Sequence, residues 1–300
     1  MKNILENRSI SKLIKPWGMV FILFTFTLGV SLAHYLGGRI NLVDLLTGFI
    51  ICLLIWSMRN FLGAYFDHPE SYHSTLNIND PERGNLLNIR RGLLLLYTLL
   101  ILTAGATLTT ILIFRGVFNA SSILWLGLAI LINFFSVAPP LHLSQNGFGE
   151  LVEALYIANL VPAIAFSLVE TSPSVLIVEL TLPLTFIYVA MKIALEFKAY
   201  GFDGSHGRQS LVIRVGWQNA LVMHNLFLLL AYVLLGVFLL LGLPWSLTWP
   251  PLLTLPFASL QILHLIGISN GAKPKWRYLT WLAIGLFLSI VYMMIISLWL

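Results

Sequence analysis

The stretch KIALEFKAYGFDGSHGRQSLVIRVG, Lys192 to Gly216, joins the end of a long apolar run to a loop rich in charged residues. A second such junction is NFLGAYFDHPE, Asn60 to Glu70. Only 10% of the 300 residues are charged, and the mean hydropathy is +0.89. Ionisable groups beside apolar segments are costly to desolvate, so they tend to face a water-filled cavity and mark a substrate path. We therefore expect the chemistry in these two loops.

Apolar runs of about 20 residues recur along the whole chain on both sides of these loops. A helix of about 20 residues is long enough to cross a bilayer. The sequence predicts an all-α, polytopic membrane protein, with its helices in one bundle around a central cavity. Residues 1–300 form a single domain, and residues 1–16 are a basic tail. The nine predicted spans are 17–36, 43–65, 92–114, 121–138, 149–169, 175–198, 219–242, 248–268 and 278–299.

The distribution of Lys and Arg predicts the orientation of these spans. Basic residues gather in the amino-terminal tail and after the second, sixth and eighth spans, whereas the odd-numbered loops carry only Arg39 and Arg115. Cytoplasmic loops carry the excess of Lys and Arg. The amino terminus and both polar loops are therefore predicted to be cytoplasmic, and the carboxyl terminus lies outside. The bilayer is the expected partner, and no basic-aromatic surface indicates nucleic acid.

Two segments carry a resemblance to a known family. GFDGSHGRQSLVIRVG, Gly201 to Gly216, resembles the second aspartate motif of the UbiA superfamily of membrane prenyltransferases, and SVAPPLHLSQNGFGELVEAL, Ser136 to Leu155, follows the fourth span as in that family. Pro139 to Gly147 resembles the branch with chlorophyll, menaquinone and archaeal-lipid prenyltransferases. The resemblance covers nearly the whole chain. It implies transfer of a prenyl group from a prenyl diphosphate, bound through Mg²⁺, to a small aromatic or lipid acceptor.

The resemblance also implies roles for individual residues. Asp67 and Asp203 are the expected catalytic carboxylates, and Asp67, Glu196 and Asp203 are the expected Mg²⁺ ligands. Mg²⁺ usually takes one or two carboxylates together with phosphate and water, so one acid on each loop is a compatible set. The residues expected to bind the diphosphate are Lys198, Arg208, Arg214 and His142.

The acidic motifs depart from the family pattern. Gly63 and Ala64 stand at the Asn-Asp positions of the first motif, Ser71 stands at its third acid, and Ala199 replaces a central aspartate of the second. A cation precedes each motif on the same helical face, in the sets Arg59, Gly63, Asp67, Glu70 and Lys192, Glu196, Ala199, Asp203. We hypothesise that Arg59 and Lys192 partly replace missing metal charge, or neutralise carboxylates left without metal.

Three alternatives remain open. Glu196 can pair with Lys192 or Lys198 in a partly buried salt bridge instead of binding metal. The incomplete motifs are also compatible with a catalytically weakened homologue that binds an isoprenoid or acts with an active enzyme. A small transporter is a third interpretation, although transporters usually place their polar groups at mid-membrane, whereas these charges gather at one side.

Overall fold

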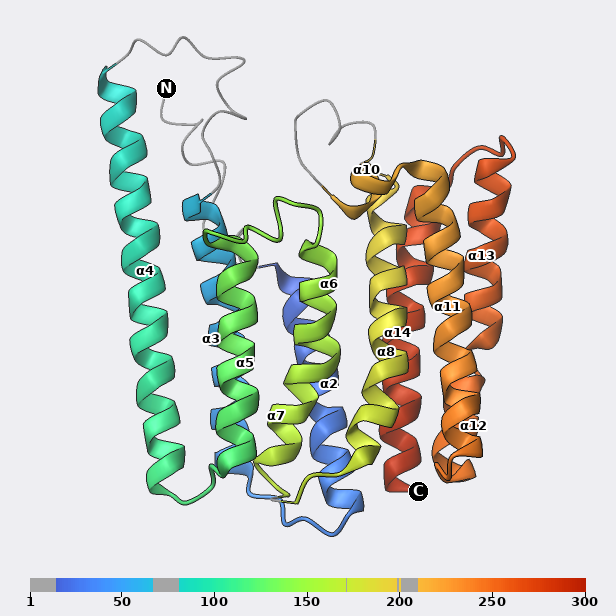
Figure 1. Ribbon diagram of the computed structural model, residues 1–300, viewed down its shortest axis with the longest axis horizontal. Helices are drawn as coiled ribbons and strands as arrows, with labels where there is room; N and C mark the ends of the chain where they lie inside the picture. Colours follow the sequence, from blue (N-terminus) through green and yellow to red (C-terminus); the bar gives the residue numbers. More distant parts are fainter. Residues whose placement is uncertain (1–14, 67–80, 171, 199, 201–209) are drawn as a thin grey trace.

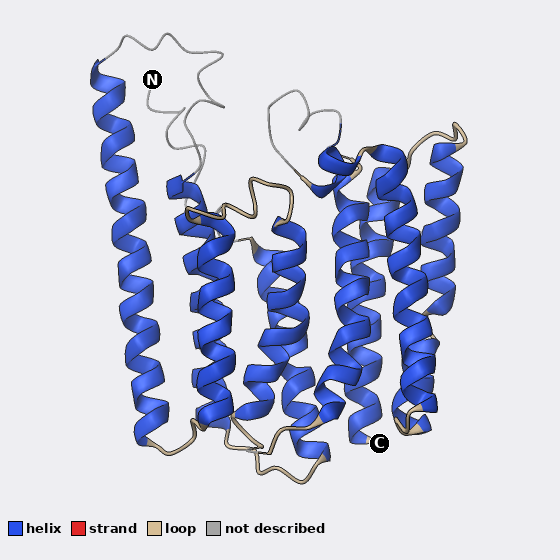
Figure 2. Ribbon diagram, in the orientation of Figure 1, coloured by secondary structure: helices blue, strands red, loops and turns tan. Residues whose placement is uncertain are grey.

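The computed structural model describes residues 15–66, 81–170, 172–198, 200 and 210–300, with the backbone alone over 81–90. Within these ranges all regular secondary structure is helical, which confirms the predicted all-α class (Figure 2). The helices stand roughly side by side in one bundle (Figure 1).

The helices follow one another in chain order, and five of these segments have eight residues or fewer. They are α2 (Pro16–Tyr35), α3 (Leu42–Phe66), α4 (Pro81–Phe114), α5 (Ala120–Val137), α6 (Gly149–Ala154), the π-helical segment η3 (Leu155–Leu160), α7 (Val161–Ser167), α8 (Val175–Glu196), α10 (Leu211–Val215), α11 (Trp217–Leu240), α12 (Trp245–Leu252), α13 (Leu255–Ser269) and α14 (Trp276–Trp299).

Nine helical stretches in the described part of the chain are long and apolar enough to cross a membrane, as predicted from the sequence. The main difference is α4, which begins at Pro81, well before the predicted start of that span at residue 92. Proline is favoured in the first turn of a helix because its missing N–H has no intrahelical partner there. The protein is therefore an integral, multi-pass membrane protein whose third span extends beyond its apolar part.

Two spans are interrupted. The fifth runs through α6, η3 and α7, and Pro162 lies in the first turn of α7. Proline has no N–H to donate to the carbonyl four residues earlier, so the helix widens locally at this point. The eighth span is divided into α12 and α13, with Pro250 and Pro251 just before the division. Each of these two spans therefore consists of shorter helical segments instead of one continuous α-helix.

The connections alternate between the two ends of the bundle (Figure 1). Residues 138–148, which join α5 to α6, lie at the same end as residues 270–275, which join α13 to α14, and we call this end the loop end. Arg39 and Arg115 belong to connections at the opposite end. Arg115 forms an ion pair there with Asp44 of α3, with 2.7 Å between Nε and Oδ1. The predicted cytoplasmic orientation of the loop end remains a prediction.

Close backbone contact holds the centre of the bundle together. α8 packs along α11 and α14, and α2 packs along α7 and α14. Gly29 of α2 lies directly against α7, because a Cβ atom built there would stand 2.1 Å from the carbonyl oxygen of Pro162. Small residues let transmembrane helices approach closely. This contact fixes the position of the interrupted fifth span relative to α2.

Replacing Gly29 by alanine should therefore destabilise the protein. The added methyl group meets backbone, which can only yield by separating α2 from α7, and overpacking of this kind costs about 1–3 kcal/mol. The measurement is the thermal unfolding midpoint in detergent. Gly105→Ala in α4 is the matched control, since nothing lies within 4 Å of its Cβ position. Equal midpoints for the two variants would contradict the close contact.

Candidate functional site

Three helices bring charged side chains together just inside the loop end. Arg59 lies two turns before the end of α3, Glu153 in the first turns of α6, and Lys192 one turn before the end of α8. At a rise of about 1.5 Å per residue, all three lie roughly 6–10 Å inside their helix ends. Residues far apart in the sequence therefore meet at one depth of the membrane-spanning bundle.

Glu153 is the centre of this group. Its Oε1 accepts hydrogen bonds from Lys192 Nζ at 2.9 Å and from the hydroxyl of Tyr188 at 2.7 Å. Its Oε2 pairs with Arg59 Nη1 at 3.4 Å. The carboxylate is buried, with 8% of its side chain exposed. A buried carboxylate persists when it is paired and hydrogen-bonded, and two cations and a phenol satisfy that condition here.

Each of the three guanidinium nitrogens of Arg59 donates a hydrogen bond. Besides Glu153, it donates from Nε to the hydroxyl of Ser136 at 3.1 Å and from Nη2 to the carbonyl of Gly149 at 3.2 Å. It also lies 5.6 Å from the centre of the Trp56 ring, within reach of a cation–π contact. Arg59 therefore ties α3 to the end of α5 and the start of α6, and its side chain is 7% exposed.

An aromatic layer separates the charged group from the deeper apolar core. Tyr188, Phe21 and Phe287 contact one another edge to face, with ring centres 5.0–5.7 Å apart. Trp56 stacks on Tyr156, whose hydroxyl donates to the carbonyl of Cys52 at 2.6 Å. Tyr188 thus has its ring in the aromatic layer and its hydroxyl on Glu153. The layer fixes the orientation of that hydroxyl.

Several buried polar atoms near this group have no hydrogen-bond partner within the described part of the chain. They belong to α3, α5, the loop 138–148 and the first turn of α6. They are Trp56 Nε1, Asn60 Nδ2, Asn133 Oδ1, His142 Nδ1, Ser144 Oγ and Glu150 Oε2. Buried polar groups in proteins nearly always have a partner, whether protein or ordered water, so each such group calls for an explanation. These atoms lie on the segments that Arg59 joins or on the adjoining loop, where ordered water or a bound ligand would supply the missing partners.

Two of the predicted diphosphate-binding residues lie on or against the loop 138–148. Arg214 of α10 donates to the carbonyl of Asn146 and lies 4.3 Å from the centre of the Phe148 ring. His142 adopts a positive φ of 41°, and its ring contacts Phe66 at the end of α3. Arg214 therefore attaches α10 to the loop above α6, next to the group of charges. Their predicted role in binding diphosphate remains a prediction.

The remaining predicted residues are distributed differently. Asp67, Asp203 and Arg208 lie outside the described residues. Glu196 is half-buried at the end of α8, and Lys198, just beyond it, is exposed. Among the described residues no group of three or more His, Cys, Asp or Glu side chains is arranged to hold a metal ion. The predicted Mg²⁺ ligands therefore remain a prediction.

Arg59 and Lys192, predicted to compensate for missing acids, do come together, and the carboxylate between them is Glu153. This residue is not among those selected from the sequence, and neither are its neighbours Tyr188 and Ser136. A signal was available, because Glu153 is an acid within the predicted span 149–169, and an ionisable residue inside a span calls for a partner. Whether the two cations also compensate for the acidic loops stays a prediction.

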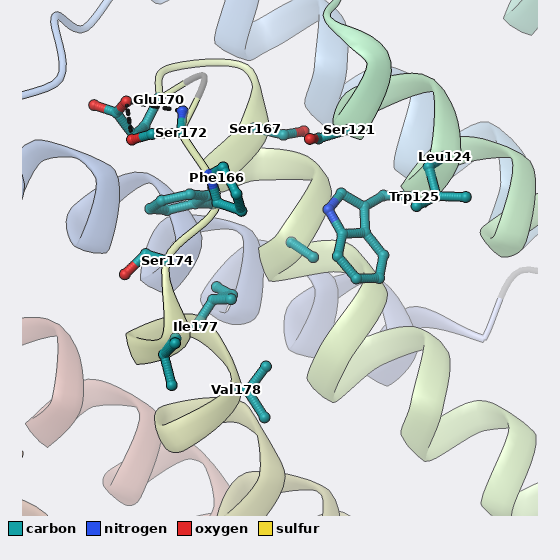
Figure 3. A pocket seen from close by; sticks show the side chains of 13 residues that line it. Ser121, Leu124, Trp125, Phe166, Ser167, Glu170, Ser172, Ser174, Ile177 and Val178 are labelled. Carbon is teal, nitrogen blue, oxygen red and sulfur yellow. Dashed lines mark hydrogen bonds between the residues drawn. The ribbon is translucent and has the colours of Figure 1, made fainter.

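A cavity lies at the opposite end of the bundle, between α5, α7 and the start of α8 (Figure 3). It has a volume of about 540 Å³ and largely apolar walls, with Trp125 and Phe166 among the side chains that line it. Glu170 at its edge accepts hydrogen bonds from the backbone N–H and the hydroxyl of Ser172. This cavity is remote from the group of charges around Glu153 and adds nothing to it.

No protein-family model and no curated protein matches the sequence. Solved structures do match the fold. A UbiA homolog from Archaeoglobus fulgidus bound to GPP and Mg²⁺ is 15% identical, with 97% of this chain and 98% of that chain covered and a TM-score of 0.67. The same homolog bound to DMAPP and Mg²⁺ is 14% identical over 95% and 98%, with a TM-score of 0.60.

A third match is the structure of a digeranylgeranylglyceryl phosphate synthase, which is 12% identical, with 94% of this chain and 92% of that chain covered and a TM-score of 0.63. At these identities the shared property is the arrangement of the helices over nearly the full length of both chains. The match over nearly the full length of both chains shows that this chain has the fold of the UbiA homologs.

Proposed function

We propose that this protein transfers a prenyl group from a prenyl diphosphate to a small aromatic or lipid acceptor, assisted by Mg²⁺, with the loop end in the cytoplasm. The observation that carries the proposal is the buried group of Arg59, Glu153 and Lys192, which lies at the loop end of a fold whose solved examples bind GPP or DMAPP with Mg²⁺. A diphosphate needs fixed positive charge at one end of an apolar bundle. This group supplies that charge.

Electrostatics favours an anion beside this group. One carboxylate stands between two cations, so the group has a net charge of about +1 in a medium of low dielectric constant, where charge interactions are stronger than in water. Arg59 gives three of its five N–H donors to protein acceptors and Lys192 gives one of its three, so two remain on each, but the Arg59 side chain is only 7% exposed. The side chain of Lys192 is 21% exposed. Lys192 is thus the cation best able to bind an incoming phosphate oxygen.

The donor chemistry at the loop end fits Mg²⁺. The ion prefers oxygen ligands and binds through one or two carboxylates plus substrate phosphates. Glu150 has a buried oxygen without a hydrogen-bond partner among the described residues, so a carboxylate oxygen is available at this end of the bundle. Asp67, Glu196 and Asp203 are the residues that would hold the ion. Bound there, Mg²⁺ would neutralise negative charge on the diphosphate.

The residues of the chain then have defined tasks. Lys192, held in place by Glu153, donates to a diphosphate oxygen and stabilises the charge that grows on it as the bond between the allylic carbon and that oxygen breaks. The electron pair leaves with the diphosphate. Apolar and aromatic side chains below exclude water from the allylic carbon. The acceptor attacks the same carbon and loses a proton, so the products are the prenylated acceptor and diphosphate.

A second candidate function is binding of an isoprenoid diphosphate without transfer. The pairing of Arg59 and Lys192 with Glu153 favours it, because this positive group is complete without a metal ion. In that case binding would be indifferent to Mg²⁺ and no prenylated product would form. The two functions are therefore separated by metal dependence and by product.

Replacing Lys192 by methionine should weaken binding of GPP by about tenfold or more, since a charge-assisted hydrogen bond to phosphate contributes about 1.5–3 kcal/mol. Lys192→Arg, which keeps the charge, should retain most of the binding. The measurement is the dissociation constant for GPP in detergent. Lys273→Met, an exposed lysine in the connection to α14, is the matched control and should bind as the unchanged protein does.

The single variants Lys192→Met and Glu153→Gln separate binding from stability. Lys192→Met leaves Glu153 paired with Arg59, whereas Glu153→Gln leaves two cations without their counter-charge, and breaking a buried ion pair in this way costs about 3–5 kcal/mol. Glu153→Gln should therefore lower the thermal unfolding midpoint more than Lys192→Met, yet Lys192→Met should bind GPP more weakly. If the loss of GPP binding follows the loss of stability across the two variants, Lys192 acts only as the partner of Glu153.

Binding of GPP should require Mg²⁺ and both predicted loop carboxylates. In EDTA, and in Asp67→Asn or Asp203→Asn with Mg²⁺, affinity should fall at least tenfold, because the diphosphate charge is no longer neutralised. Glu179→Gln, a carboxylate near the opposite end of α8, is the control and should leave the dissociation constant unchanged. Binding equally tight in EDTA would reject the metal-assisted mechanism and favour binding by the fixed cations alone.

A further inference from the structure

A basic opening lies at the loop end where α8 finishes and α14 begins. Lys198, Lys275 and Arg277 line it together with Trp276 and Tyr278, and its volume is about 510 Å³. The described residues that line it include no carboxylate. Three positive charges around one opening repel each other, and an anion bound between them would remove that repulsion.

An aromatic group at the base of the opening holds its walls together. Trp217, the first residue of α11, contacts Phe197 at 4.4 Å and Tyr200 at 5.8 Å between ring centres, and contacts Trp276 at 6.2 Å. Phe197 is 2% exposed. The end of α8, the start of α11 and the start of α14 are therefore joined by tilted and edge-to-face ring contacts. This frame fixes the backbone positions from which the three cations extend.

The start of α14 adds positive potential to the opening. Lys275 is the capping residue and Arg277 lies in the first turn of this 24-residue helix, and no side chain caps the helix by a hydrogen bond. The first N–H groups of a helix carry partial positive charge. The opening thus combines three cationic side chains with a helix terminus, an arrangement suited to a phosphate group.

We infer that this opening binds the phosphate headgroup of an anionic phospholipid. Tyr278 is 46% exposed and lies with Trp276 near the end of a membrane span, where aromatic residues occupy the headgroup level of the bilayer. Basic residues between helices at this level attract anionic headgroups. Lys198 then belongs to a lipid site at the bundle surface, separate from Lys192, which pairs with Glu153 of α6. The inference is independent of the proposed prenyl transfer.

The test is lipid binding to the full-length protein in neutral detergent, measured by native mass spectrometry with no prenyl diphosphate present. Phosphatidylglycerol should bind to the unchanged protein more tightly than zwitterionic phosphatidylcholine. Lys275→Gln/Arg277→Gln should weaken phosphatidylglycerol binding about tenfold or more, and Lys198→Gln should weaken it in the same direction. The charge-retaining Lys275→Arg/Arg277→Lys should keep the binding, which separates loss of charge from misfolding.

Arg39→Gln/Lys273→Gln is the matched control, because it removes the same charge from exposed residues that do not line the opening. It should leave phosphatidylglycerol binding unchanged. An equal loss in the control would overturn the inference by showing a general charge effect. Displacement of the lipid by equimolar inorganic phosphate or GPP would also overturn it, because the opening would then be a site for a free phosphate or for the substrate. The assay needs no catalysis, so failure of the proposed function leaves its result intact.

Discussion

The burial of Glu153 between Arg59 and Lys192 is the constraint on which the loop end of this structure depends. A carboxylate inside a membrane span is unfavourable unless cations and hydrogen-bond donors surround it. Those partners come from α3 and α8, so the helix that carries Glu153 can occupy only the place where both are within reach. The hydroxyl of Tyr188 adds a second contact from α8, and the guanidinium contacts to Ser136 and Gly149 connect this centre to the end of α5 and the start of α6.

The arrangement of spans could be predicted from the sequence because each transmembrane helix satisfies its own backbone hydrogen bonds. An apolar run of sufficient length therefore predicts a helix without information about its neighbours. The nine predicted spans are confirmed. Helix ends depend on polar residues and on proline, whose effects vary with context. The early start of α4 at Pro81 and the division of the eighth span after Pro251 are the places where hydropathy alone was insufficient.

The site was less predictable because it depends on which side of each helix packs against its neighbours. The regular spacing on single helices drew attention to Arg59 and Lys192, but their common partner is 94 and 39 residues away in the sequence. No periodicity on α3 or α8 contains that information. The same holds for Arg214, whose place beside the α5–α6 loop follows from where α10 packs, and for Lys198, which lines an opening with the start of α14.

The departures from the acidic motifs that the sequence resembles can be compared with this geometry. Ala64 and Ala199 stand where that resemblance leads us to expect acids, while Arg59 and Lys192 are cations within α3 and α8. Two such cations would repel each other strongly without a ligand, and Glu153 supplies a fixed counter-charge that makes them tolerable. Glu153 balances one of the two positive charges, so the group keeps a net charge of about +1 and attracts anions. In the proposed complex with a prenyl diphosphate, these fixed cations within the helices would share with Mg²⁺ the neutralisation of the diphosphate charge.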